Sequence, residues 1–288
     1  MVIEKLANLF PPDMKMGKIR NYVEPFIGGG ALFFYIAQNF PSINSFFISD
    51  VNEELILAYK TIQKNVEGLI SFLTALEKKY RSLDEPEQRD FFYHKRADFN
   101  NKIASIDFKI YCDNWIERTA TIIFLNRTCF NGLFRVNSKG EFNVPFGDYK
   151  NPKICDAGNL RAVSELLQKT EIKLGDFETS NVFVDSSTFV YFDPPYRPLS
   201  KTASFTSYSK MEFNDKSQKR LAEYFALLSE RKAKLMLSNS DPKNINPEDK
   251  FFENLYEGFR IERVDVSRII NSNASKRGKI KELVILNY

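Results

Sequence analysis

The stretch of sequence that most constrains the fold is a short apolar run that ends in two prolines. Residues 188–192 are β-branched or aromatic, and Asp193, Pro194, Pro195 and Tyr196 follow them directly. The run predicts a buried strand that stops at the prolines, because proline has no N–H to donate to a sheet. In an open α/β sheet, ligands bind beyond the carboxyl ends of the strands, so this carboxylate and this ring would face a ligand. Taken alone, the four residues also fit a plain proline turn.

A glycine-rich turn forms the second signal. Residues 24–30 read Glu-Pro-Phe-Ile-Gly-Gly-Gly and lead from a strand-like run into an apolar helix-like one. Glycines let the backbone approach a ligand and open the N-terminus of the following helix toward it. Asp50 ends the next strand-like run, twenty residues after Gly30, where an acidic side chain binds ribose hydroxyls in nucleoside-binding folds. The glycine turn and Asp50 together predict a site for a nucleoside-containing cofactor. The alternative is a tight turn that binds nothing, with Asp50 as a helix cap.

A third strand-like run, residues 171–174, also leads to an acid and an aromatic residue. Asp176 can accept a hydrogen bond from the exocyclic amine of an adenine, and Phe177 can pack on the ring. The alternative is that both residues belong to a solvated loop.

Strand-like and helix-like segments alternate at both ends of the chain but not in its middle. Residues 57–156 show mainly helical periodicity, with a polar stretch at 81–87 that indicates a loop. The sequence predicts an α/β fold with a Rossmann-like sheet and helices on both faces, formed by residues 1–56 and 157–288. Residues 57–156 would be a mainly helical inserted domain with a β-hairpin.

The inserted segment contains residue types suited to reading DNA. Residues 125–147 combine arginine and asparagine with aromatic and aliphatic side chains, and Ser-Lys-Gly-Glu at 138–141 is typical of a hairpin tip. Guanidinium and amide groups read base edges through paired hydrogen bonds, and apolar side chains can wedge into a base stack. An Asn/Gly-rich hairpin is more often only a hairpin, and the net charge of +4 permits a nucleic-acid partner without requiring one. The basic tail around Arg277 can contact phosphates or form a solvated turn.

Composition argues against several other classes of protein. The three cysteines, Cys112, Cys129 and Cys155, form no C-x-x-C pair, so neither a disulfide framework nor a zinc site is indicated. The sequence has no unbroken apolar run long enough to span a bilayer and no charged leader before an apolar core. We expect a cytoplasmic protein with no membrane partner and no metal.

Four blocks in this order resemble the Dam-type DNA adenine methyltransferases. They are Glu-Pro-Phe-x-Gly-x-Gly from residue 24, Asn-Gly-Leu-x-Arg from 131 with Gly-Glu-Phe-Asn-Val-Pro-Phe-Gly from 140, Asp-Pro-Pro-Tyr from 193, and Leu-Ser-x-Thr-Ala-x-Phe-Thr-x-Tyr from 199. The match extends from about residue 22 to the end, and the second and fourth blocks are much more specific than the third. The resemblance implies a Rossmann-like S-adenosylmethionine-dependent methyltransferase sheet, with residues 57–156 as a target-recognition domain. It further implies methyl transfer from S-adenosylmethionine to N6 of adenine in double-stranded DNA at 5′-GATC-3′, by base flipping and direct transfer.

The resemblance also implies roles for individual residues. The catalytic residues would be Asp193, Pro194, Pro195 and Tyr196. The residues that bind the cofactor would be Glu24, Pro25, Phe26, Gly28, Gly30, Asp50, Asp176, Phe177 and Asp193. The residues that bind DNA would be Asn126, Arg127, Phe130, Asn131, Gly132, Leu133, Arg135, Asn137, Asn143, Pro145, Ser200 and Arg277.

For some of these residues the resemblance also implies which part of the cofactor or of the DNA they would contact. Phe26, Gly28 and Gly30 would line the methionine end of the cofactor, with Asp50 at its ribose and Asp176 at its adenine. Arg135 would read a guanine in the major groove and Leu133 would contact the thymine. Phe130 and Asn131 would fill the gap left by the flipped adenine; Phe130 stands where a tyrosine is usual, and stacking needs only the ring.

One block usual in the family has no counterpart in this sequence. It is a Lys-Trp-x-Gly-Gly-Lys segment before the first helix, whereas this sequence begins Met-Val-Ile-Glu and its only tryptophan is Trp115. Because that block helps to close over the cofactor, we expect weaker cofactor binding. An alternative function is therefore a DNA-binding protein with weak or no methyltransferase activity. A second is methylation of RNA or of a protein amide, against which the Arg135 hairpin argues. The resemblance suggests a monomer, with a cognate restriction endonuclease as a functional partner.

Overall fold

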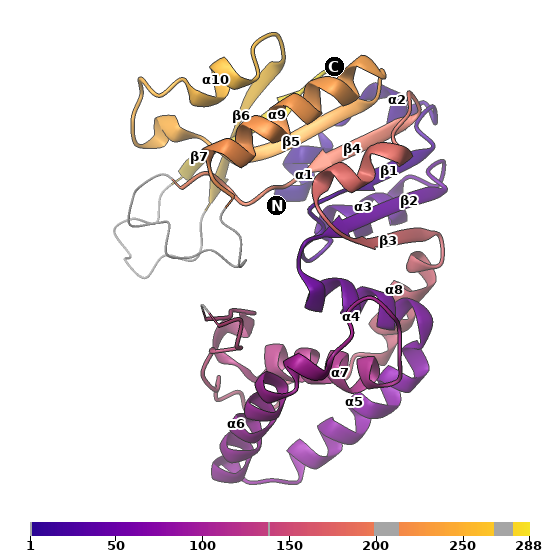
Figure 1. Ribbon diagram of the computed structural model, residues 1–288, viewed down its shortest axis with the longest axis vertical. Helices are drawn as coiled ribbons and strands as arrows, with labels where there is room; N and C mark the ends of the chain where they lie inside the picture. Colours follow the sequence, from indigo (N-terminus) through magenta and orange to yellow (C-terminus); the bar gives the residue numbers. More distant parts are fainter. Residues whose placement is uncertain (1, 138, 199–212, 268–278) are drawn as a thin grey trace. The chain divides into compact units, whose positions relative to one another are not determined.

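The computed structural model describes residues 2–137, 139–198, 213–267 and 279–288. The described residues form two compact units (Figure 1). One, the sheet unit, holds the described residues up to 51 and from 169 onward; the other, the helical unit, holds residues 52–168. Among these residues, each helix is too short or too polar to cross a lipid bilayer.

The sheet unit is built on seven strands in the order β3-β2-β1-β4-β5-β7-β6 (Figure 1). The strands are β1 Asn21–Glu24, β2 Ser45–Asp50, β3 Thr170–Leu174, β4 Thr188–Phe192, β5 Lys234–Ser240, β6 Arg260–Ser267 and β7 Lys279–Leu286. The first five pair in parallel, and β7 is antiparallel to both β5 and β6. The predicted strand at residues 188–192 is confirmed as β4, which lies at the centre of the sheet and is buried throughout.

Apolar side chains on β4 alternate between two packed faces. Val190 and Phe192 lie in one core with apolar residues of α9 (Asp215–Glu230) and α10 (Phe251–Leu255). On the other face, the ring centroid of Phe189 lies 5.5 Å from that of Phe10, which follows α1 (Val2–Ala7) and precedes α2 (Pro12–Lys15). Phe33 of α3 (Ala31–Asn39) packs edge-on against Phe46 of β2 at 5.6 Å. The predicted α/β sheet with helices on both faces is confirmed.

The helical unit contains five α-helices among its described residues. They are α4 Glu53–Lys64, α5 Val66–Arg81, α6 Glu85–Asn101, α7 Asn114–Thr128 and α8 Ala157–Leu167, with short 3-10 turns η1 Ile103–Ser105 and η2 Phe130–Gly132. The loop expected at residues 81–87 is wrong in its second half, because α6 begins at Glu85. Asp84 accepts a hydrogen bond from the Glu87 N–H, Glu87 returns one to the Asp84 N–H, and Pro86 fits the first turn.

A buried ion pair joins α7 to α4 inside the helical unit. The Nε of Arg118 donates to both carboxylate oxygens of Glu54 at 3.2 and 3.1 Å, and its Nη1 donates to the carbonyl of Phe99. The guanidinium carbon also lies 3.5 Å from the centroid of the Phe99 ring. The Arg118 side chain is 3% exposed and that of Glu54 is 13% exposed, so neither charge can be hydrated well if the other is removed.

We expect Arg118→Met to lower the free energy of unfolding of the helical unit by about 3–5 kcal/mol, because Glu54 would keep its charge without a partner. Urea denaturation followed by circular dichroism would measure the loss. The matched control is Arg161→Met, since Arg161 pairs with Glu67 at the surface with both side chains more than half exposed, and little change is expected there. Equal effects of the two substitutions would contradict this account of the pair.

Candidate functional site

Acidic residues stand at the carboxyl ends of four neighbouring strands of the sheet unit. Glu24 ends β1, Asp50 ends β2, Asp176 follows β3, and Asp193 follows β4 directly. Because these strands run parallel, all four residues lie at the same edge of the sheet. The fold thus places at one edge of the sheet four acidic residues that lie in separate motifs of the sequence.

The glycine turn after β1 is tied to the end of β2. The N–H of Gly28 donates to the carboxylate of Asp50 at 3.2 Å, and Gly28 has a φ of 46°, a value that favours glycine. Gly30, with a φ of 69°, immediately precedes α3. A Cβ placed on Gly28 would meet no atom within 4 Å. The turn therefore offers open space beside a carboxylate, which fits a ligand that carries hydroxyl groups.

Asp176 and Phe177 begin the 3-10 segment η3 (Phe177–Phe183). Asp176 accepts from the N–H of Glu178 at 3.0 Å and forms an ion pair with Arg220 of α9. The guanidinium of Arg220 lies 4.6 Å from the centroid of the Phe177 ring, and Phe26 packs against the same ring at 5.6 Å. Phe177 is 2% exposed, so its ring is part of the core and supports Phe26. A contact of Phe177 with a cofactor ring stays a prediction.

Asp193 interacts with Tyr196 and with a second carboxylate, that of Glu282. The hydroxyl of Tyr196 donates to Glu282 of β7 at 3.4 Å. Solvent reaches the Asp193 side chain, yet the protein around it raises the pKa of its carboxyl to about 6 by desolvation, and the charge of Glu282 adds to this; a hydrogen bond with Tyr196 opposes both. Asp193 is therefore mainly ionised at neutral pH and close to titrating.

Glu24 lies beneath this surface. It is 3% exposed, and its Oε2 accepts a hydrogen bond from the hydroxyl of Tyr22 at 2.6 Å. Burial raises the pKa of Glu24 well above its usual value; the Tyr22 hydrogen bond opposes this and the charge of Asp193 adds to it. Glu24 therefore supports the site from below, held by the Tyr22 hydroxyl.

The DNA-binding candidates of the helical unit gather in one hairpin. Val136 and Phe142 form an antiparallel bridge, as do Cys129 and Phe146. Backbone hydrogen bonds from the Asn137 N–H to the Glu141 carbonyl and from the Asn143 N–H to the Arg135 carbonyl also link the two sides, and the Asn137 side chain accepts from the N–H of Glu141 at 3.0 Å. Asn126 and Arg127 lie in the last turn of α7, just before the hairpin. The remaining candidates in the hairpin are Phe130, Asn131, Gly132, Leu133, Arg135, Asn143 and Pro145.

Several of these side chains are exposed, and the backbone holds them in place. Phe130 is 54% exposed, and its N–H donates to the carbonyl of Pro145 at 2.9 Å. Asn131 adopts a φ of 57°, which asparagine tolerates better than most residues. The Nε of Arg135 donates to Asn143 at 2.8 Å. Leu133 instead packs partly into the core of the helical unit.

Two predicted DNA contacts, Ser200 and Arg277, lie outside the described residues, as does the block from residue 199 to 208. Within the described part of the chain, no three His, Cys, Asp or Glu side chains converge in a way that would hold a metal ion.

Comparison with known proteins identifies the family. Residues 2–270 match the model of the D12 class of N6 adenine-specific DNA methyltransferases. The chain belongs to this family. The type II methyltransferase M.MjaIII of Methanocaldococcus jannaschii is 49% identical over all of this chain and 95% of its own length. The type II methyltransferase M1.LlaDCHI of Lactococcus lactis subsp. cremoris is 39% identical over 94% of this chain and 87% of its own length. The DNA adenine methylase of Haemophilus influenzae is 34% identical over 92% of this chain and 83% of its own length.

This D12 methyltransferase is thus an S-adenosylmethionine-dependent enzyme that methylates adenine N6 in DNA. The edge of its sheet fits that cofactor on two observations. A ligand can approach the backbone at Gly28, where an added Cβ would meet no atom within 4 Å, and the carboxylate of Asp50 lies beside this position as an acceptor for hydroxyl groups.

We expect the rate of methyl transfer to fall as the pH drops through about 6, because Asp193 can accept hydrogen bonds fully only when ionised. Glu282→Gln removes the neighbouring charge that helps to raise this pKa, so the fall should move to lower pH. Single-turnover rates between pH 5 and pH 8.5 would measure both profiles.

The control is Glu262→Gln on β6, a carboxylate that pairs with Arg260 instead of facing Asp193. Its pH profile should match that of the unmodified enzyme. A Glu282→Gln profile that also matches would show that Glu282 does not tune Asp193.

Proposed function

We propose that this enzyme methylates the adenine of 5′-GATC-3′ in duplex DNA, after turning that base out of the helix, and that the methyl group passes directly to N6. The observation that carries the proposal is the environment of Asp193. An ionised acceptor stands at the carboxyl end of the central strand, beside an aromatic ring and at the same edge as the glycine turn and Asp50.

Two acceptors at this position would activate the adenine amine. The amine is a poor nucleophile because its lone pair is delocalised into the ring. Hydrogen bonds from its two N–H groups to the Asp193 carboxylate and the Pro194 carbonyl would draw the nitrogen toward tetrahedral geometry and free that lone pair. Among the described residues, the Pro194 carbonyl has no hydrogen-bond partner, whereas the next carbonyl, that of Pro195, accepts one from Gln218 at 3.2 Å.

The chain would also hold the cofactor and take up a proton. Phe26, Gly28 and Gly30 would hold its methionine end, and Asp50 and Asp176 its ribose and adenine. S-adenosylmethionine, when bound, supplies a methyl group on a sulfonium that a nucleophile can attack. The methylated nitrogen must then lose a proton, and Asp193, with a pKa of about 6, is suited to accept it.

Tyr196 would stack on the extruded adenine. Base flipping costs a few kcal/mol, which stacking and hydrogen bonds in the pocket offset. Glu282 accepts from the Tyr196 hydroxyl at 3.4 Å and so fixes the direction of the ring.

The hairpin of the helical unit would read the target sequence. Because Arg135 uses its Nε for Asn143, the guanidinium plane is fixed; among the described residues its two Nη nitrogens have no partner and can donate in parallel to a guanine. The exposed ring of Phe130, with Asn131, would fill the gap left by the flipped adenine, and Leu133 would contact the thymine. The helical unit would thus be the target-recognition domain.

The setting of the enzyme is part of the same proposal. Two relatives are named type II methyltransferases, which supports a cognate restriction endonuclease as a functional partner. We further propose a monomer that acts in the cytoplasm.

Transfer of a radiolabelled methyl group to a GATC duplex, but not to a GTTC duplex, is the expected result that tests this function. Asp193→Ala should abolish transfer and leave binding to the GATC duplex largely intact, because the hairpin is unchanged. Equal labelling of both duplexes would refute the sequence specificity, and turnover by Asp193→Ala would refute the mechanism. DNA binding by the unmodified protein without labelling would favour a DNA-binding protein that lacks the activity.

Arg135→Ala should reduce discrimination at the guanine position by about 1–3 kcal/mol, because a paired donor to the base is lost. Competition between GATC and AATC duplexes at fixed salt would measure it. Lys139→Ala is the matched control, since it removes one positive charge from the tip of the same hairpin and should weaken binding to both duplexes alike. Unchanged discrimination in Arg135→Ala would assign the reading of guanine to another residue.

A further inference from the structure

Two buried side-chain amides lie directly under the Asp-Pro-Pro-Tyr segment. Asn239 is near the end of β5 and Gln218 is in the first turn of α9; both are 0% exposed. The Nδ2 of Asn239 donates to Gln218 Oε1 at 3.3 Å, and Gln218 Nε2 donates to the carbonyl of Pro195 at 3.2 Å. The Oδ1 of Asn239 accepts from the N–H of Arg197 at 3.0 Å and from that of Ser240 at 2.9 Å. The pair therefore holds the backbone on both sides of Tyr196.

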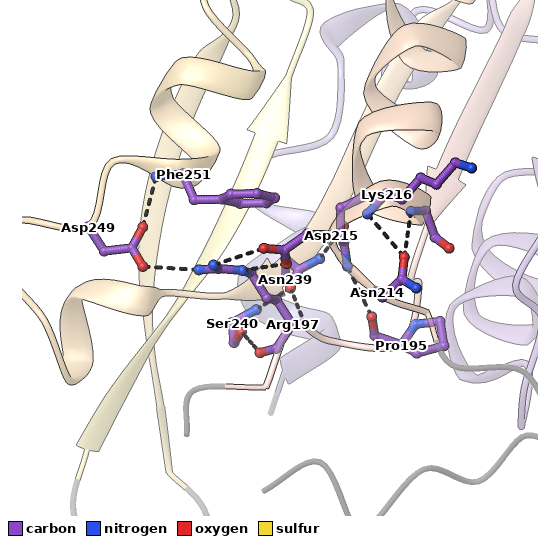
Figure 2. A network of polar contacts seen from close by, with 11 residues as sticks. Pro195, Arg197, Asn214, Asp215, Lys216, Asn239, Ser240, Asp249 and Phe251 are labelled. Atoms are coloured by element: carbon purple, nitrogen blue, oxygen red, sulfur yellow. Dashed lines mark hydrogen bonds and ion pairs between the residues drawn. The ribbon is translucent and has the colours of Figure 1, made fainter. Parts of the chain in front are cut away.

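Arg197 is held further by its side chain and its carbonyl (Figure 2). Its guanidinium donates to both carboxylate oxygens of Asp215, at 2.8 and 3.2 Å, and to Asp249 at 3.0 Å. The guanidinium carbon lies 4.1 Å from the centroid of the Phe251 ring, and the hydroxyl of Ser240 donates to the Arg197 carbonyl at 2.7 Å. The residue after Tyr196 is thus fixed against α9, β5 and the segment that leads into α10.

These contacts restrict how the peptide units around Tyr196 can rotate. The two prolines already fix the φ angles of residues 194 and 195. The amide pair then fixes the direction of the Pro195 carbonyl and of the Arg197 N–H, which leaves Tyr196 little freedom. The orientations of the tyrosine ring and of the Pro194 carbonyl depend on this restriction, and a displacement of about 1 Å at a reacting centre can cost about 100-fold in rate.

We propose that Asn239 and Gln218 are positioning residues for methyl transfer, which orient the Pro194 carbonyl and Tyr196 toward the adenine amine. This inference rests on the proposed roles of Asp193, Pro194 and Tyr196. Neither amide touches the substrate; both act through the backbone of the Asp-Pro-Pro-Tyr segment.

A purely structural role would have a different signature. An amide that only stabilises the fold lowers the melting temperature, and the folded enzyme keeps its turnover number. A positioning residue lowers kcat in the folded enzyme and leaves the KM values nearly unchanged, because its effect appears in the transition state.

The chain offers a matched control for this distinction at the other end of β5. Asn287 makes three hydrogen bonds of similar length, from the Leu235 N–H at 2.8 Å, to the Ser229 hydroxyl at 3.0 Å and to the Ala233 carbonyl at 2.8 Å. It therefore ties the start of β5 to the end of α9, as Asn239 ties the end of β5 to the start of α9. Asn287→Ala and Asn239→Ala each remove three hydrogen bonds, but only the second lies beside the site.

The experiment compares kcat, both KM values and melting temperature for Asn239→Ala, Gln218→Met, Asn287→Ala and Asp193→Ala on the full chain with a GATC duplex. Each is assayed at least 15 °C below its own melting temperature. We expect Asn239→Ala and Gln218→Met to lower kcat by about 10- to 100-fold, with KM values within about threefold of the unmodified enzyme. Asn287→Ala should lower the melting temperature and keep kcat. Gln218→Met is close to glutamine in size and keeps the backbone contacts of Asn239, so it tests the proposal even if Asn239→Ala does not fold.

The inference is overturned if every amide variant that folds keeps the kcat of Asn287→Ala while Asp193→Ala is inactive. Turnover by Asp193→Ala would instead overturn the proposed function, whatever the amide variants do. The two failures are therefore distinguishable.

Discussion

The parallel pairing of β4 with β1 and β5 is the constraint on which the rest of the sheet unit depends. β4 is buried along its whole length and ends at Phe192, because two prolines follow Asp193. Parallel neighbours then bring the ends of β1, β2 and β5 to the same edge. A carboxylate, a glycine turn and a pair of buried amides, far apart in sequence, meet there only because the strands share a direction.

This convergence places several carboxylates close together. The charge of Glu282 adds to the desolvation that raises the pKa of Asp193, and the charge of Asp193 adds to the burial that raises the pKa of Glu24. Glu24 is buried, and the Tyr22 hydroxyl donates a hydrogen bond to its carboxyl group. Asp193, which solvent still reaches, keeps its charge at neutral pH. Desolvation, and after it the charge of Glu282, raise the pKa of Asp193 to about 6, which suits a group that accepts a proton near neutral pH.

The sequence was sufficient to predict the central strand and the acids at the strand ends, because each depends on a local pattern. An apolar, β-branched and aromatic run that stops at two prolines predicts the end of a buried strand. The spacing of Asp50 from the glycine turn is the length of one helix and one strand in a βαβ unit. The capping box at Asp84 and Glu87 is also a local pattern, because both residues lie within one turn. The expected loop at residues 81–87 gave weight to Pro86, yet proline fits the first turn of a helix as well as it fits a loop.

The contacts that no local pattern shows are those between distant segments. Arg220 reaches Asp176 across 44 residues and Asn239 reaches Arg197 across 42, and neither pair has a spacing that indicates contact. The burial of Phe177 likewise depends on Phe26 and Tyr224, which only the tertiary fold brings to its ring. A residue after a strand is therefore easy to place at an edge, but whether its ring faces a ligand or the core depends on long-range packing.

The loop that follows β4 needs hydrogen-bond partners for its backbone, and in the described part of the chain only some of its groups have one. Its backbone groups lie beyond the strand ladder and need other partners. Here side chains satisfy the Pro195 carbonyl and both the N–H and the carbonyl of Arg197, whereas the carbonyl of Pro194 has no hydrogen-bond partner among the described residues. That carbonyl belongs to the residue next to Asp193. An amine with two N–H groups could donate to the Pro194 carbonyl and to the Asp193 carboxylate together, which is what the proposed activation of the adenine amine requires.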